Sequence, residues 1–243
     1  MVIINADDFG MNESCSRAIA RAFFEGLITD TTMMATGEYF DKAVLLAKER
    51  GFSDRIGIHF NLTEGTPLTQ GVCSVQAFVR DGRFCKRYEW NHDLTEEQAQ
   101  AVYDELCAQV EKLKKAGIGI THADSHHYLH NAPYLAPIFV KVCREFGIKK
   151  IRLQRNLGAG ERSSDRNAYY REQGFRMTKY FARLRDLEHI AVPDDTEILV
   201  HPDFDKNGRL IDRRGTADGH PIGAPLSDLK KQGFSDLGSY NIL

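Results

Sequence analysis

The sequence predicts an α/β fold in which parallel strands close into a distorted (β/α) barrel of about seven strands. Short apolar runs rich in β-branched residues alternate with amphipathic segments of helical period along most of the chain. This alternation is typical of a parallel sheet with right-handed helical crossovers. About seven such units favour a closed barrel over an open sheet. Because no repeat or linker interrupts the pattern, we expect residues 1–243 to form one domain.

Composition and charge restrict the class of partner. The chain is 42% hydrophobic and 27% charged, which is typical of a globular protein with a sizeable core. A net charge of −2 gives no electrostatic reason to bind nucleic acid or an anionic membrane, and no apolar run has the length of a membrane span. The cysteines are odd in number and scattered, and Met1 leads into a strand without a basic leader. These features predict reduced thiols and a cytoplasmic location.

The N-terminal half supplies three of the expected strands. An apolar run begins at Val2 and ends at two adjacent aspartates, and helical spacing of Ala, Ile and Phe predicts a helix over 12–25 that Gly26 ends. A Thr- and Met-rich run predicts a strand over 29–36. A helix follows over 39–50 and stops at Gly51. The segment 55–63 predicts a third strand whose end carries a histidine.

The C-terminal half continues the alternation. Residues 95–98 form a capping box that opens a long helix closed by Gly117, and 118–124 predicts the next strand. Further expected elements are a helix over 133–146, strands over 148–153 and 196–201, a helix over 226–232 and a short strand over 238–243.

Two segments do not follow the alternation. Residues 64–91 lack periodicity and contain the lone Trp90, which predicts a functional loop or lid. Residues 156–185 are basic and aromatic and predict one or two helices whose aromatic side chains pack in the core rather than stack on sugars. Any of these aromatic side chains that are exposed would suit a homodimer contact.

Two carboxylates follow the first strand directly. Asp7 and Asp8 lie where α/β folds collect their chemistry, at the carboxyl end of a strand. Adjacent carboxylates repel each other unless a cation or a shared proton relieves them. The pair therefore indicates a metal site, a proton-transfer site or both. The alternative is that Asp8 or Asn12 only caps the following helix.

Histidines at later strand ends extend this site. Asp8, His59 and one histidine of the 124–130 cluster can provide two imidazoles and a carboxylate, a set that leaves a position open for water and is typical of catalytic metal sites. Imidazole suits Zn²⁺, Co²⁺, Ni²⁺ or Fe²⁺, and carboxylate with water also suits Mg²⁺ or Mn²⁺. Asp7 would then be free to take the proton of the water. Asp124 is placed to orient a ligand histidine.

Each histidine also has a simpler interpretation. His59 alone can be a hydrogen-bonded strand-end group. His126 and His130 have i, i+4 spacing, so both can face one site, or one can bind the metal and the other the substrate, while His127 is expected to point elsewhere. His201 precedes a proline and is therefore extended, where it either donates a proton to a leaving group or closes the barrel mouth.

Four motifs in order resemble the YdjC/ChbG-like carbohydrate deacetylases. They are Asn5–Gly10, Gly57–Thr63, Asp124–His127 with His130, and His201-Pro202, and together they extend over nearly the whole chain. The resemblance implies a distorted, TIM-like (β/α) barrel related to the NodB-type polysaccharide deacetylases. It also implies removal of acetyl groups from N-acetylated sugars such as chitooligosaccharides or N-acetylglucosamine derivatives.

The resemblance assigns roles by motif. It implies one divalent metal ion, Mg²⁺ or Zn²⁺, held by Asp8, His59 and His126. It further implies metal-assisted amide hydrolysis with Asp7 as general base and His201 as general acid. Arg152 falls beside the site and, with His130, is expected to bind substrate. Tyr128 departs from the family, because many relatives have a third consecutive histidine there, and this affects substrate contacts more than metal binding.

Two other functions fit the same residues. One is a metal-dependent hydrolase of another amide or of a phosphoester, although the chain has no glycine-rich phosphate cradle. The other is a non-catalytic sugar-binding regulatory protein. That function predicts loss of the base or of the metal ligands, all of which are present.

Overall fold

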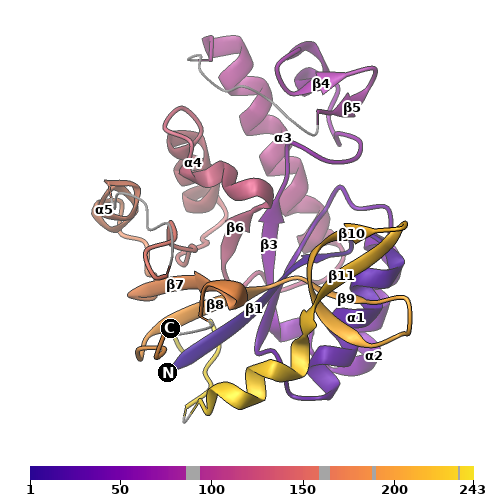
Figure 1. Cartoon of the computed structure of the whole chain (residues 1–243). Coiled ribbons are helices and arrows are strands. Elements are labelled where there is room, and N and C mark those ends of the chain that lie inside the picture. Colours follow the sequence, from indigo (N-terminus) through magenta and orange to yellow (C-terminus); the bar gives the residue numbers. More distant parts are fainter. Residues whose placement is uncertain (86–93, 159–164, 188–189, 235) are drawn as a thin grey trace.

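The computed structural model describes residues 1–85, 94–158, 165–187, 190–234 and 236–243. Within these ranges six strands pair in parallel in the order β6-β3-β2-β1-β8-β7, with helices on the outside of the curled sheet (Figure 1). The strands of this sheet are β1 (Val2–Phe9), β2 (Asp30–Met33), β3 (Ile56–Phe60), β6 (Ala123–Ser125), β7 (Tyr180–Arg183) and β8 (Thr196–Val200).

An irregular segment lies between the two edges of this sheet. Isolated backbone bridges join Ala123 of β6 to Ile151, and Lys150 to Arg176 just before β7. The strand expected over 148–153 is therefore present only as these bridges. Six regular strands and this segment account for the predicted number of about seven. The predicted class, an α/β fold with a distorted barrel, is confirmed.

Helices begin and end largely where the sequence predicts. The Asn12 side chain accepts a hydrogen bond from the Cys15 backbone N–H at 3.0 Å and caps the first helix. Gly51 ends the second helix in the left-handed conformation, with φ of 75°, and the capping box of Thr95 and Gln98 forms at the third. The helices are α1 (Glu13–Phe24), α2 (Phe40–Arg50), α3 (Glu96–Lys115), α4 (Ala136–Glu145) and α5 (Asp165–Glu172).

The expectation of helices throughout 156–185 is wrong for its second half. The segment forms α5 and then β7, whose Phe181 and Ala182 are fully buried against the neighbouring strand β8. This strand has only two buried apolar residues between arginines and tyrosines, so the sequence gives no clear strand pattern there. The expected burial of the aromatic side chains is confirmed for Tyr170, Phe175 and Phe181.

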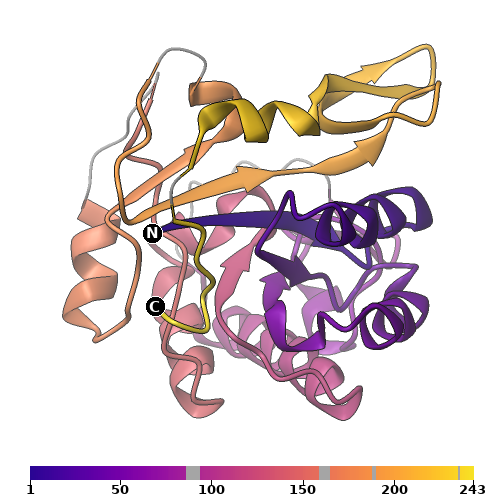
Figure 2. The ribbon, with the colours of Figure 1, turned by 90° about the horizontal axis from the view of Figure 1, so that it is seen from below.

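The chain after β8 also differs from the expectation. It forms an antiparallel sheet of β9 (Pro202–Phe204), β10 (Leu210–Ala217) and β11 (His220–Pro225), with β9 packed against α1 (Figure 2). Residues 226–232 form a 3₁₀ helix. Residues 238–243 form no strand, and the Gly238 N–H donates to the Val2 carbonyl at 2.9 Å, which places the C-terminal tail beside the start of β1.

Within the described part of 64–91 the chain forms a 3₁₀ turn over Gly71–Ser74 and a small hairpin of β4 (Val79–Arg80) and β5 (Arg83–Phe84). Trp90 lies outside the described residues. The described part of the chain includes no helix that is long and apolar enough to cross a membrane. All five cysteines lie in the described ranges, and none of them forms a disulfide there.

Candidate metal and catalytic site at the barrel rim

The predicted site residues meet at the carboxyl ends of the parallel strands. β1 contributes Asp7 and Asp8, β3 contributes His59, and His126 and His201 follow β6 and β8. His59 lies directly opposite Asp124 in the β3–β6 register. These residues border a pocket of about 380 Å³ that Asp7, Asp8, His59, His126 and His201 line together.

An irregularity in β1 brings both aspartates to the pocket. Neighbouring residues of a regular strand point to opposite faces of the sheet. The β1–β2 register shifts between Ala6 and Phe9, and Asp8 has a φ of 71°, in the left-handed region that non-glycine residues rarely occupy. This strained backbone lets Asp7 and Asp8 line one pocket. The alternative that Asp8 only caps α1 is wrong, because Asn12 is the cap.

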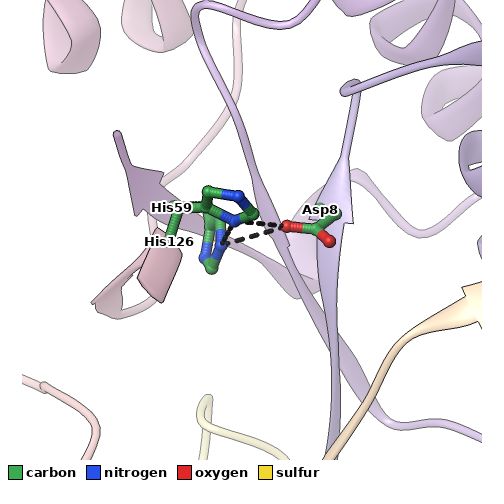
Figure 3. A group of neighbouring side chains, drawn as sticks. All are labelled: Asp8, His59 and His126. Atoms are coloured by element: carbon green, nitrogen blue, oxygen red, sulfur yellow. Dashed lines mark hydrogen bonds and ion pairs between the residues drawn. The ribbon is translucent and has the colours of Figure 1, made fainter. Parts of the chain in front are cut away.

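Asp8, His59 and His126 converge on one point (Figure 3). Asp8 Oδ1 lies 2.9 Å from His126 Nδ1 and 3.3 Å from His59 Nε2, and the two ring nitrogens are 3.3 Å apart. Ligand atoms that each lie about 2.0–2.2 Å from one ion are roughly 3 Å apart. The three side chains therefore have the spacing of a metal-ligand set.

The hydrogen bonding of Asp8 also fits a cation. Its Oδ1 is buried and accepts no hydrogen bond from any residue that the structure describes, although two imidazole nitrogens lie close to it. Its Oδ2 accepts a hydrogen bond from Arg213 of β10 at 3.0 Å. Burial opposes ionisation, yet His126 and His59 hold the pKa of Asp8 well below its ordinary value. Oδ1 is thus a buried anionic atom directed at two nitrogens, as a metal ligand would be.

Asp124 orients His59, as the alternation of side chains along this strand predicts. Its Oδ1 lies 2.6 Å from His59 Nδ1, and its Oδ2 accepts a hydrogen bond from Thr32 Oγ1 at 3.0 Å. This contact places the ring proton on Nδ1 and leaves Nε2 free to bind a cation. Burial opposes protonation, but Asp124 and then Asp7 raise the pKa of His59 to about 10. The electrostatics of the site therefore favour an added positive charge.

Asp7 is paired with Arg152 beneath the pocket. Arg152 donates to both Asp7 oxygens and to Glu197 Oε1, each at 2.7 Å, and its Nη1 forms an ion pair with Asp124 Oδ2 at 2.7 Å. Burial opposes ionisation of Asp7, but Arg152 and then His59 hold its pKa below the ordinary value. Asp7, His59 and Asp124 form a second group with ligand-like spacing. The Arg152 cation pairs with both carboxylates of this group, whereas Arg213 contacts only Oδ2 of Asp8 and leaves Oδ1 directed at the imidazoles. The group that includes Asp8 is therefore the better candidate for a metal site.

Arg152 and His130 lie below the pocket rather than in it. Both are fully buried and neither lines the pocket, which does not favour the expected direct contact with substrate. His130 Nδ1 is 2.6 Å from Ser125 Oγ, and burial lowers the pKa of His130 to about 3, so this ring is neutral. The i, i+4 spacing does not bring His126 and His130 together, because the turn between them has left-handed φ values at His127 and Tyr128.

That same turn brings His127 and Tyr128 to the pocket. The expectation that His127 points elsewhere is wrong, because its ring lines the pocket and packs 4.0 Å from the ring of His126. Its Nδ1 is 3.0 Å from Thr63 Oγ1, and burial lowers the pKa of His127 to about 4. Tyr128 contacts Phe181 edge-on and lines the same wall.

His201 and several arginines also line the pocket. The His201 backbone N–H donates to Asp212 Oδ1 at 2.8 Å, which fixes the strand end that presents the ring. Arg183 pairs with Asp186, and Arg213 with Asp8. The pocket arginines are Arg183, Arg185, Arg213 and Arg214.

Several site residues are not apparent from the sequence. Arg213 lies in the unpredicted sheet of β9–β11, and Thr32 lies in the polar strand β2, whose burial the sequence did not indicate. Glu197 gives the clearest signal, because it is a charged residue inside the otherwise apolar strand β8. A buried charge of this kind requires a partner, and Arg152 supplies it.

The fold and site define an α/β barrel with an Asp-His-His cluster at its carboxyl rim and a second aspartate beside it. A family described as YdjC-like protein matches residues 1–228, and the chain belongs to this family.

The chain is also similar in sequence to proteins named carbohydrate deacetylase. One from Listeria monocytogenes serotype 4a (strain HCC23) is 33% identical over 211 residues, covering 84% of this chain and 81% of its own. One from Brevibacillus brevis is 33% identical over 209 residues with the same coverage, and one from Vibrio campbellii is 30% identical over 208 residues, covering 83% and 77%. A solved structure from Enterococcus faecalis V583, described provisionally as a cellobiose-phosphate cleavage protein, is also similar. It is 25% identical with a TM-score of 0.68 and covers 85% of this chain and 82% of its own.

Proposed function

We propose that the protein is a metal-dependent carbohydrate deacetylase that hydrolyses the acetamide of an N-acetylated sugar. The observation that carries the proposal is the convergence of Asp8, His59 and His126 beside the second aspartate Asp7. Oδ1 of Asp8 is buried there and accepts no hydrogen bond from the residues that the structure describes. The curated relatives named carbohydrate deacetylase support the substrate class and the bond. A divalent ion held by the three ligands would polarise the acetyl carbonyl and acidify a water molecule.

Asp7 is the group proposed to take a proton. Its Oδ1 accepts hydrogen bonds from both Arg152 and Asn5, whereas Oδ2 accepts from Arg152 alone among the residues that the structure describes. Oδ2 therefore keeps a lone pair for the proton of an attacking water. The pairing with Arg152 keeps Asp7 ionised at neutral pH and fixes its carboxylate plane. The low pKa limits its strength as a base, so the mechanism depends on a water that is already acidified.

His201 is the group proposed to protonate the leaving amine. It lines the pocket with Asp7, and Asp212 anchors its backbone. A sugar that places its acetamide at the three ligands would have its nitrogen within the same pocket. Donation of the imidazole proton to that nitrogen would release the amine and acetate.

Four arginines line the pocket, two of which, Arg183 and Arg213, are already paired with Asp186 and Asp8. We propose that this cluster of guanidinium groups binds a substrate that carries negative charge. Arg183 and Arg185 approach from the β7 side and Arg213 and Arg214 from β10. Guanidinium groups suit phosphate oxygens, and the similar E. faecalis protein is described in terms of a disaccharide phosphate. We therefore extend the proposal to acetylated amino sugars that carry a phosphate group.

The test is acetate release from N-acetylglucosamine, its short β-linked oligomers and their phosphorylated forms. The expected result is activity that a chelator removes and that added Zn²⁺ or Mg²⁺ restores, with Asp7→Asn inactive. Metal-loaded protein that releases no acetate from any of these sugars would favour a hydrolase of another bond or a non-catalytic sugar-binding protein.

A further inference from the structure

The C-terminal tail, residues 237–243, lies at the opposite end of the barrel from the pocket, beyond the residues 1–228 that the family matches. It runs along the start of β1, where Leu237 bridges Val2, and both termini lie close together (Figure 2). Ser239 Oγ donates to Asp30 Oδ1 at 2.8 Å. The next residue, Tyr240, is fully buried inside the barrel.

Two chains of contacts lead from Tyr240 to Asp7. In the first, the Tyr240 hydroxyl donates to Glu197 Oε2 at 2.5 Å. The other oxygen of Glu197 accepts from Arg152 Nε at 2.7 Å, and the fork of Arg152 holds both oxygens of Asp7 at 2.7 Å. Each link joins charged or strongly polar groups in a fully buried environment, where such hydrogen bonds have short distances and defined geometry.

The second chain runs through the ring of Tyr240. The ring stacks on His122 with centroids 3.6 Å apart and planes 8° apart. The imidazole packs directly on Gly57, since a Cβ on this glycine would lie 2.6 Å from the ring. His122 Nε2 is 3.1 Å from Asn5 Oδ1, and Asn5 Nδ2 donates to Asp7 Oδ1 at 3.0 Å.

The directions of the hydrogen bonds to Asn5 and Thr121 determine which nitrogen of His122 carries the proton. An amide oxygen only accepts, so His122 Nε2 must carry the proton, and Nδ1 accepts from Thr121 Oγ1 at 2.8 Å. Burial and then the positive charge of Arg152 lower the pKa of His122 well below its ordinary value, in agreement with a neutral ring. The stacked Tyr240 ring therefore holds a neutral imidazole that orients Asn5.

We propose that Tyr240 is a positioning residue for the proposed base: the C-terminal tail closes the lower end of the barrel and sets the position of the Asp7 carboxylate through Glu197–Arg152 and through His122–Asn5. This inference rests on the proposed function for the role of Asp7, but the placement itself is a property of the buried network.

In the chain of contacts from Tyr240 through Glu197 to Arg152, Glu197 is the group whose protonation responds to loss of the Tyr240 hydroxyl. Burial raises the pKa of Glu197 to about 7, against the opposing effects of Arg152 and the Tyr240 hydroxyl. Without that hydroxyl Glu197 holds a proton more readily, and a protonated Glu197 pairs less strongly with Arg152 Nε. The guanidinium is then free to shift relative to Asp7.

The experiment compares Tyr240→Phe with Ser239→Ala. Each variant removes one buried hydroxyl that donates to a buried carboxylate, but the carboxylate is Glu197 in the first and Asp30 in the second. Tyr240→Phe keeps the ring on His122. We expect both variants to melt a few degrees below the parent protein.

The first readout is the Arg152 Nε–H resonance in ¹H–¹⁵N spectra of the metal-free protein. It should move in Tyr240→Phe and stay in place in Ser239→Ala. This measurement needs neither metal nor substrate, so it tests the placement whether or not the protein releases acetate. An unmoved Arg152 resonance in Tyr240→Phe would overturn the inference.

The second readout is steady-state kinetics. Removal of an outer contact that orients a site residue costs roughly tenfold in activity. We expect kcat of Tyr240→Phe to fall by about tenfold with KM and the Kd for Zn²⁺ within twofold of the parent values, and kcat of Ser239→Ala to stay within twofold. Equal losses of kcat in the two variants would mean that the tail only stabilises the fold, which contradicts a positioning role.

Discussion

The contact between Asp124 and His59 gives the sharpest prediction for metal binding. In the proposed site Asp124 Oδ1 accepts the proton of His59 Nδ1 at 2.6 Å and so directs Nε2 toward the metal. Asp124→Asn keeps the size of the side chain and removes its charge. The amide oxygen can still accept the ring proton, but a neutral acceptor makes His59 a weaker ligand, and Arg152 loses one of its carboxylate partners.

The expected magnitude follows from the place of Asp124 directly behind a metal ligand. Loss of an outer carboxylate costs about 10–100-fold in metal affinity, or about 1.4–2.7 kcal/mol. Because the amide keeps a hydrogen bond to Nδ1, we expect a value near the lower end, about tenfold. Loss of a ligand itself, in His126→Ala, should cost more.

The assay is competition of the protein with a chelator for Zn²⁺ at fixed pH, followed by calorimetry. Ser125→Ala is the matched control, because Ser125 is the next residue of β6 and its hydroxyl contacts His130 and not a proposed ligand. It should bind Zn²⁺ within threefold of the parent protein. A folded Asp124→Asn variant with the parent affinity, or an equal loss in Ser125→Ala, would refute the assigned orientation of His59.

Three other predictions follow from the site. Asp7→Asn should lower kcat, measured by acetate release, by about 100-fold or more, because Asp7 is the proposed base. The Kd for Zn²⁺, measured by calorimetry, should stay within threefold, because Asp7 is not a proposed ligand. A variant with the parent activity would show that Asp7 is not the base. The pKa of Glu197 is raised to about 7, so between about pH 4.5 and 7 this carboxyl holds a proton in the folded state that the unfolded chain releases. The free energy of unfolding should therefore fall as pH rises through this window, by about 3 kcal/mol at most. Urea unfolding of Glu197→Gln should show a flatter dependence on pH, and an unchanged dependence contradicts the assignment. Arg185→Ala should raise KM about tenfold for a phosphorylated acetylated sugar and less than twofold for the neutral sugar. The reason is that one charged hydrogen bond contributes roughly 1.5 kcal/mol. Equal effects on both sugars would show that Arg185 does not recognise a phosphate.

The sequence predicts the parallel core of the fold because its signals there are local. The apolar run at Val2, the cap at Asn12 and the stop at Gly51 each act within a few residues and agree with the final structure. The strand β7 and the sheet of β9–β11 depend on partners far along the chain. Their short, polar segments have no periodicity of their own, so tertiary pairing determines them.

In the site, too, some features follow from local sequence patterns and others depend on distant parts of the chain. The ends of parallel strands share one rim, so the meeting of Asp8, His59 and His126 follows from the predicted topology. The turn after β6 is different, because its left-handed residues turn His127 into the pocket, and helical spacing does not describe such a turn. The links from Tyr240 to Asp7 depend on the path of the C-terminal tail, which no local pattern indicates.

Anomalous diffraction from crystals of the protein grown with Zn²⁺ would locate the bound ion directly. We expect one strong peak about 2.0–2.2 Å from each of Asp8 Oδ1, His59 Nε2 and His126 Nδ1. A peak between Asp7 and Asp124 instead, or no peak at these three atoms at a Zn²⁺ concentration that saturates binding in solution, would contradict the proposed metal site.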